Sequence, residues 1–240
     1  MFIQSSANAA AGQSESNAYD VREELSEMDR ATTPRRSFLA ATAGLGAAVW
    51  AGIASDATAQ DSGAAAFPST QREFRVAFAS IMKHENAHVA FLKNALGSAA
   101  RPKPVFQGLE QKNRKEFIAL ARAFENTGSG AYLNAAPAIN KPAYLAAAGS
   151  IALVEGRHAG FLNVASGQPI TQMNSDFEVP IGPSDVAKAV APYVKNLNGG
   201  PPLTYSSARS DANDIAILNF ALALEYLEAD YYNINVPKFY

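Results

Sequence analysis

The sequence has 240 residues, 48% of them hydrophobic and 18% charged, and a formal net charge of −2. These values are typical of a globular protein; they exclude a disordered or fibrous chain and give no basic charge excess that would indicate nucleic-acid binding. Because no cysteine and only three histidines are present, disulfides and cysteine-ligated metal sites are excluded, and any metal site has to rely on carboxylates.

Residues 1–59 are predicted to be an export signal. Arg35 and Arg36 precede an apolar pair and an uncharged, alanine- and glycine-rich stretch over residues 37–55, and Ala57-Thr58-Ala59 has the small-x-small pattern of a cleavage site. The arrangement resembles a twin-arginine signal, which implies passage through the twin-arginine export machinery and a periplasmic or otherwise exported protein.

Two features of this segment leave alternatives open. A retained membrane anchor is the competing interpretation, but Gly44, Gly46 and Gly52 make the apolar stretch weak, so that no stable anchor is expected. The stretch before the arginines is long and acidic, whereas a signal of this kind is short and basic. Met28 is therefore an alternative start.

Residues 60–240 are predicted to form one all-α domain with four long helices. A capping-box spacing between Thr70 and Glu73 marks the start of the first helix, and Gly97 marks its end. No strand-like alternation of useful length is present. The expected helices run from the segment 67–70 to Leu96, over 112–135, over 142–166, and from Ser210 or Asp211 to about Tyr232.

The segment over residues 167–210 is predicted to be a long and mostly irregular connection. Six of the thirteen prolines fall within residues 167–203, where they interrupt any regular structure. A short helix over Ser184–Lys195 is the regular element expected in this connection.

Polar side chains interrupt the apolar face of each long helix at one level. Two helices carry a Glu-x-x-His pair there, and side chains three residues apart on a helix can converge on one ion. The other two helices each place one carboxylate in the same register. The six candidate metal ligands are Glu85, His88, Glu125, Glu155, His158 and Glu225.

Four glutamates and two histidines from four helices are the ligand set of carboxylate-bridged di-iron and di-manganese bundles. Four carboxylates neutralise two divalent cations, and hard oxygen donors with one imidazole per metal suit iron or manganese. Without metal, buried carboxylates that face one another would repel. The sequence therefore predicts two Fe or two Mn ions per bundle.

Three further residues near these positions are open to interpretation. Glu228, one turn after Glu225, is either a residue beside the ligands or on the surface, or the true ligand in place of Glu225. Tyr232 is either a hydrogen-bond donor to a ligating carboxylate or part of the apolar core. His84 is expected to point away from the site.

Several stretches resemble the ferritin-like superfamily, and more narrowly the exported ferritin-like proteins related to plant desiccation-related proteins. The resemblance implies a ferritin-like four-helix bundle with long crossover connections. In that family the segment that resembles residues 218–229 is the first helix, whereas here it is the last, which indicates a circular permutation. The matching stretches cover residues 85–96, 125–137, 155–161 and 217–229.

Two functions are compatible with these observations. The resemblance implies a di-metal protein that performs redox chemistry with O₂ or peroxide, either catalase-like or ferroxidase-like. The alternative is a structural protein in which the connection over 167–210 delivers the last helix to a neighbouring subunit. Such an exchange would produce a homo-oligomer or a filament, with a metal site that is structural or absent.

Overall fold

The structure is a computed structural model that describes residues 70–240. The predicted export signal, with Arg35 and Arg36, and the alternative start at Met28 lie outside the described residues. Within residues 70–240, no helix is long and apolar enough to cross a membrane.

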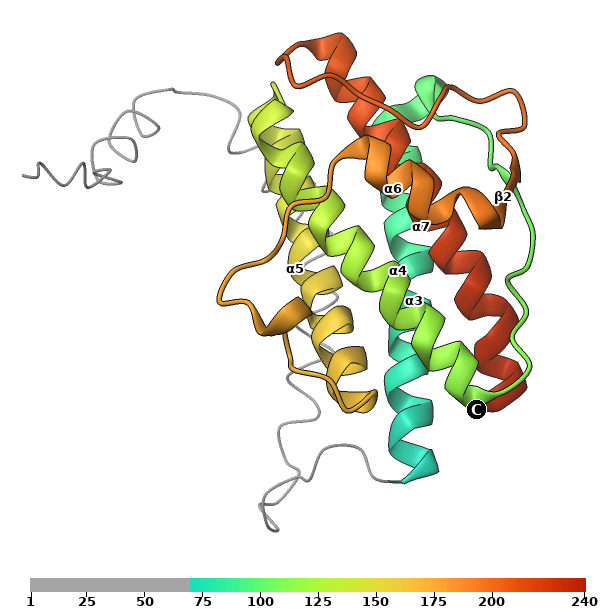
Figure 1. Cartoon of the computed structure of the whole chain (residues 1–240). Coiled ribbons are helices and arrows are strands. Elements are labelled where there is room, and N and C mark those ends of the chain that lie inside the picture. The colour runs from blue at the N-terminus through green and yellow to red at the C-terminus, as the bar shows by residue number, and fades with distance from the viewer. Residues whose placement is uncertain (1–69) are drawn as a thin grey trace, which may run out of the picture. The chain divides into compact units, whose positions relative to one another are not determined.

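Four long helices form a bundle, as the sequence predicts (Figure 1). Their starts follow local side-chain chemistry: Thr70, Asn113 and Ser210 each cap the helix that follows them, and Pro142 occupies a first-turn position. The long helices are α3 (Gln71–Leu96), α4 (Arg114–Ala135), α5 (Pro142–Ala165) and α7 (Asp211–Phe239), and the short helix is α6 (Pro183–Val190).

Short elements fill the connections between the helices. Two short strands form a small antiparallel sheet. The strands are too short to give a recognisable pattern in the sequence. The remaining elements are β1 (Val105–Phe106), β2 (Val194–Asn196) and the 3₁₀ turns η1 (Gly97–Ala99), η2 (Ala136–Ala138), η3 (Gln172–Asn174) and η4 (Ala191–Tyr193).

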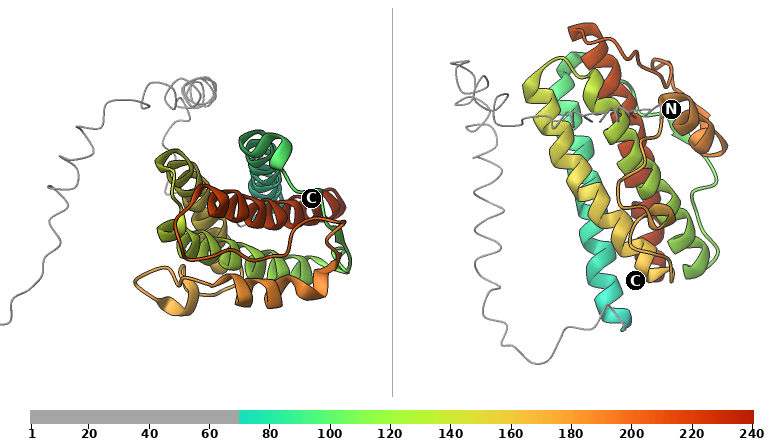
Figure 2. Two further views of the ribbon diagram at one scale, coloured as in Figure 1. Left: turned by 90° about the horizontal axis from the view of Figure 1, so that it is seen from above. Right: turned by 60° about the vertical axis from the view of Figure 1, so that its left-hand side comes forward.

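The long helices pack as two antiparallel pairs, α3 with α7 and α4 with α5 (Figures 1 and 2). Near the start of α3, Phe78 stacks on Tyr240, which follows the end of α7. In the other pair, the amide groups of Asn126 and Asn163 exchange two hydrogen bonds. The connections α3–α4 and α5–α7 both run along the length of the bundle, as the sequence predicts, and α6 packs on the outer side of α4.

The two long connections are joined to each other and to α7. Strands β1 and β2 belong to different connections, so their pairing ties one connection to the other. The buried Arg101 donates its backbone N–H to Asn219 Oδ1 on α7 and its guanidinium to the carbonyl of Pro201. The last helix thus packs within its own chain in this structure, and the exchange of this helix between chains stays a prediction.

The core consists of two apolar clusters on either side of the ligand level. Along α3, for example, Glu85 lies between Phe78 of one cluster and Leu92 of the other. Along α7, Glu225 lies between Leu222 and Tyr231 in the same way. The carboxylates are therefore enclosed by apolar layers, which exclude water and raise the free-energy cost of an unpaired charge.

Helix α7 is longer than predicted, because it continues beyond Tyr232 to Phe239. Pro237 lies inside its last turn, where a proline removes only one helical hydrogen bond. The buried Val236 and the contact of Phe239 with Phe117 favour the extension. The guanidinium of Arg114 donates two hydrogen bonds to the carbonyl of Phe239, which satisfies a carbonyl at the helix end.

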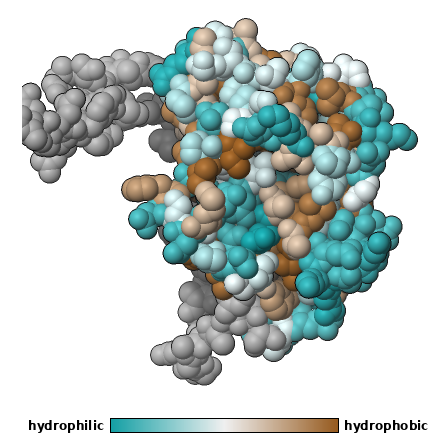
Figure 3. Space-filling model, in the orientation of Figure 1, coloured by the Kyte–Doolittle hydropathy of each residue, from teal (hydrophilic) through white to brown (hydrophobic). Residues whose placement is uncertain are grey.

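Some apolar side chains are exposed at the surface. On the face that Figure 3 shows, they lie in separate patches with polar residues between the patches. The outer sides of α4 and α5 contribute to this exposure: Leu153 is 66% exposed, and Leu133 and Leu145 are partly so.

Candidate metal centre

The six predicted ligands meet in one buried layer between the four long helices. Each of the four glutamates is at most 1% exposed, and His158 is buried with them. His88 is the most accessible member, with 11% of its side chain exposed. Such a concentration of buried carboxylates requires a compensating charge.

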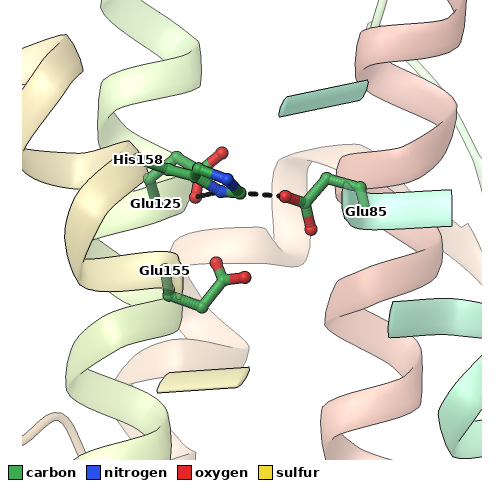
Figure 4. A group of neighbouring side chains, drawn as sticks. All are labelled: Glu85, Glu125, Glu155 and His158. Atoms are coloured by element: carbon green, nitrogen blue, oxygen red, sulfur yellow. Dashed lines mark hydrogen bonds and ion pairs between the residues drawn. The ribbon is translucent and has the colours of Figure 1, made fainter. Parts of the chain in front are cut away.

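Two groups of four side chains have ligand atoms within 4.8 Å of one another. Glu85 and Glu155 belong to both groups. Glu125 and His158 complete the first group, in which Glu85 faces His158 and Glu125 across the centre of the bundle (Figure 4). His88 and Glu225 complete the second group. Spacing in the sequence could not reveal which glutamates are shared, because that depends on how the helices face one another.

Each ligand imidazole directs its Nδ1 atom at carboxylate oxygens. His158 Nδ1 lies 3.0 Å from Glu85 Oε1 and 3.2 Å from Glu125 Oε2. His88 Nδ1 lies 3.1–3.3 Å from oxygens of three glutamates, Glu155, Glu225 and Glu85. One nitrogen carries at most one proton, so it cannot satisfy three acceptors at once, whereas a divalent cation among these atoms would satisfy all of them.

Electrostatics reflects the same crowding. Burial lowers the pKa of His158, but Glu125 and Glu85 outweigh burial and raise this pKa to about 11. Burial, together with the charge of Glu155, raises the pKa of Glu85 to about 7, although hydrogen bonds from both histidines oppose the rise. Burial and the charges of Glu125 and Glu225 hold the pKa of Glu155 well above its usual range.

The hydrogen-bond partners of the Glu85 and Glu155 oxygens indicate whether the layer is suited to a metal ion. Three buried oxygens, Glu85 Oε1 and both of Glu155, have no hydrogen bond of good geometry. An imidazole Nδ1 lies 3.0 Å from Glu85 Oε1 and 3.1 Å from Glu155 Oε1, whereas Glu155 Oε2 has no polar partner among the described residues. Buried polar atoms without partners are rare, and those that occur commonly mark a missing ion or water. The donor set therefore fits metal ions bound between the helices.

Two tyrosines hold the two unshared glutamates in a reciprocal arrangement. Tyr132 of α4 donates a 2.5 Å hydrogen bond to Glu225 of α7, and Tyr232 of α7 donates a 2.5 Å hydrogen bond to Glu125 of α4. Of the two interpretations of Tyr232, the structure favours the hydrogen-bond donor. Tyr132 was not predicted to be a site residue. Its position gives the same signal as that of Tyr232, because Tyr132 follows Glu125 by seven residues as Tyr232 follows Glu225.

The expectation that His84 points away from the site is wrong. Its Nδ1 atom lies 2.9 Å from His158 Nε2, and the two rings stack at 5.2 Å. Burial and the charges of His158 and His88 lower the pKa of His84 to about 4, so its ring is neutral near pH 7. His84 precedes His88 by one helical turn and could have been assigned to the same face.

Glu228 lies beside the ligand layer and not on the surface, since it is 2% exposed. It faces Gly128 of α4, where an added Cβ atom would lie 3.4 Å from Glu228 Oε1 and 3.2 Å from Glu155 Oε2. Burial and the charges of neighbouring glutamates hold the pKa of Glu228 well above its usual range. Glu225 is thus a member of one ligand group, whereas Glu228 belongs to neither group and lies beside the layer.

A comparison with protein families gives a match over the first three long helices. A model of the ferritin-like domain matches residues 34–168, which is more than half of the chain. No curated protein and no solved structure matches the chain. Because the match ends before α7, it is the structure that brings Glu225, Glu228 and Tyr232 to the other side chains.

Proposed function

Because the chain belongs to the ferritin-like domain family, we propose that its buried glutamates and histidines hold two iron or two manganese ions. The observation that carries this proposal is the sharing of Glu85 and Glu155 by two ligand groups. Two ions that share these carboxylates would give each group a cation and would provide a partner for Glu155 Oε2.

In this assignment each ion has one terminal glutamate and one histidine. Glu125 and His158 would hold one ion, and Glu225 and His88 would hold the other. The tyrosine hydroxyls fix the orientation of the terminal carboxylates, as residues behind metal ligands generally do. Four carboxylates balance the charge of two divalent cations.

When bound, such ions supply redox chemistry with O₂ or peroxide, which is the activity we propose for this chain. The chain's own residues prepare the site for it. A tyrosine hydroxyl holds each of Glu125 and Glu225. Within the described part of the chain, Glu85 and Glu155 make polar contacts only with imidazoles, so their carboxylates would be freer to reorient around the ions. The apolar clusters on both sides keep bulk water away from the layer.

We further propose kinship with the desiccation-related ferritin-like proteins, in circularly permuted form. The stretch that resembles the family's first helix forms α7, the last helix, and this helix lies outside the matched residues 34–168. The packing of α7 against α3 and the two connections along the bundle are compatible with this order. Export by the twin-arginine route rests on the sequence pattern at Arg35 and Arg36.

Peroxide turnover tests the redox function. Full-length protein loaded separately with Fe²⁺ or Mn²⁺ should consume peroxide with one of these ions, and the double variant Glu85→Ala, Glu155→Ala should lose this activity. Glu110→Gln removes an exposed carboxylate and serves as the control that keeps it. A loaded protein that consumes neither peroxide nor O₂, but unfolds at higher temperature than the metal-free protein, would overturn the redox function in favour of a structural metal site.

A further inference from the structure

The two helix pairs repeat one residue pattern around the ligand layer. Helices α3 and α5 each supply a Glu-x-x-His pair, and α4 and α7 each supply a glutamate with a tyrosine seven residues later. The repeat breaks three residues after the terminal glutamate. At this position α4 has Gly128, whereas α7 has Glu228.

Gly128 is explained by the space that it leaves. It is not among the glycines with positive φ, so its backbone does not require glycine. In a helix interior, glycine costs about 0.5–1 kcal/mol relative to alanine. What glycine provides here is space next to two carboxylates. An alanine Cβ at this position would lie only 3.2 Å from Glu155 Oε2 and 3.4 Å from Glu228 Oε1.

The two carboxylates that converge on this space are both buried. Glu155 Oε2 accepts no hydrogen bond, and Glu228 is 2% exposed. The charges that act most strongly on Glu228 are those of other glutamates, first Glu155 and then Glu125. A carboxylate held among carboxylates in an apolar core is unfavourable unless a cation lies next to it.

We propose that Glu228 is a seventh ligand of the ion pair and that Gly128 provides the space in which its carboxylate reaches the ions. The inference rests on the proposed di-metal function. Five carboxylates carry one negative charge more than two divalent ions balance, so Glu228 also favours an ion pair in which one ion is trivalent. The chain would accordingly bind its ions more tightly, and keep them oxidised more readily, than the six-ligand set alone.

Titration of the metal-free full chain with Mn²⁺ tests the proposal, with free Mn²⁺ followed by its EPR signal and bound ions counted by elemental mass spectrometry. The variant Glu228→Gln keeps the shape of the side chain and removes its charge. We expect its affinity for Mn²⁺ to fall at least about tenfold, as is typical when residues around a metal site are replaced.

A pair of glycine variants separates the space at Gly128 from a general effect of substitution. Gly128→Ala keeps all five carboxylates but fills the space, and we expect weaker Mn²⁺ binding. Gly149→Ala on α5 is the matched control, because an added Cβ there has no neighbour within 4 Å and binding should be unchanged.

The outcomes separate this inference from the proposed function. Wild-type protein that binds two Mn²⁺ ions while Glu228→Gln binds them with unchanged affinity overturns the seventh ligand and leaves the di-metal site intact. Wild-type protein that binds no Mn²⁺ and no Fe²⁺ overturns both.

Discussion

The α3–α7 pair and the α4–α5 pair provide the same chemistry but not the same surroundings. Each pair contributes one Glu-x-x-His and one terminal glutamate, and each terminal glutamate is held by a tyrosine from the other pair. The neighbouring residues differ, since Glu228 has Gly128 as its counterpart and His84 has Val154. The comparison indicates that both halves share the proposed ligands and the tyrosines that hold them. The two halves differ in the residues next to these ligands.

The largest expected effect comes from the side chains that both halves share. Replacing Glu85 and Glu155 together by alanine removes the two proposed bridges and should reduce the metal content from the proposed two ions per chain to near zero. The stabilisation by bound metal, about 2.7 kcal/mol when the free ion is at one hundred times its Kd, should disappear as well. Elemental mass spectrometry and thermal unfolding measure both effects, and a variant that retains two ions would show that the shared position is not a bridge.

Removing one terminal glutamate should affect one half only. Glu125→Ala and Glu225→Ala are each expected to leave about one ion per chain, because the histidine and the two bridges of the other group remain. The same metal analysis checks this result. If either variant loses both ions, the two groups do not act as separate binding positions.

The metal-free protein should lose stability as the pH rises. A carboxyl whose pKa is higher in the folded than in the unfolded state binds more protons when folded, so the free energy of unfolding falls with rising pH between the two values. For Glu85 this range extends from about 4.5 to about 7, with a slope of about 1.4 kcal/mol per pH unit for one such group. The raised pKa of His158 acts in the same direction from 6.5 to about 11. The lowered pKa of His84 opposes the effect of Glu85 between about 4 and 6.5, so the net decrease depends on the raised pKa values of Glu125, Glu155 and Glu228.

Denaturant unfolding of chelator-treated protein at pH 5, 6 and 7 measures this slope. Protein saturated with metal should show a much smaller decrease, since bound cations take the place of the protons. A metal-free protein that becomes more stable from pH 5 to pH 7 would contradict the crowding of carboxylates in the layer.

The two tyrosine contacts should be equivalent. Tyr132→Phe and Tyr232→Phe each remove one hydrogen bond to a terminal glutamate, and each is expected to weaken metal binding about tenfold. Parallel titrations with Mn²⁺ compare them directly. A large effect of one variant and none of the other would show that the reciprocal arrangement does not operate in solution.

The smallest effects are expected outside the layer. Asn219→Ala leaves the backbone N–H of Arg101 without its acceptor and should cost about 2 kcal/mol of stability, with the metal content unchanged. Lys103→Ala removes only an exposed ion pair with Asp230 and should cost about 0.5 kcal/mol or less. Denaturant unfolding ranks the two variants, and loss of metal in Asn219→Ala would mean that the connections also shape the site.

Helix periodicity was sufficient to predict the bundle and to select six residues that the structure brings together. Glu85, His88 and their counterparts interrupt apolar faces, and this local signal survives folding because each helix turns such a face inward. The predicted end of α7 at about Tyr232 was wrong, because contacts of Phe239 with Phe117 and Arg114, which no local pattern reveals, extend the helix.

Other features depend on tertiary contacts that no single helix reveals. The sharing of Glu85 and Glu155, and the hydrogen bond from Tyr132 to Glu225, depend on how helices from opposite pairs face one another. His84 stands next to Glu85 in the sequence but reaches His158 on another helix. The pairing of β1 with β2 joins two connections through strands of two and three residues, which carry no periodic signal.

Metal content per chain tests the central claim most directly. Protein purified from the cells that produce it, without added metal, should contain about two Fe or two Mn ions per chain by elemental mass spectrometry. A well-folded protein that contains neither ion, and that takes up neither Fe²⁺ nor Mn²⁺ when these are supplied, would contradict the di-metal site and identify the layer as a polar core.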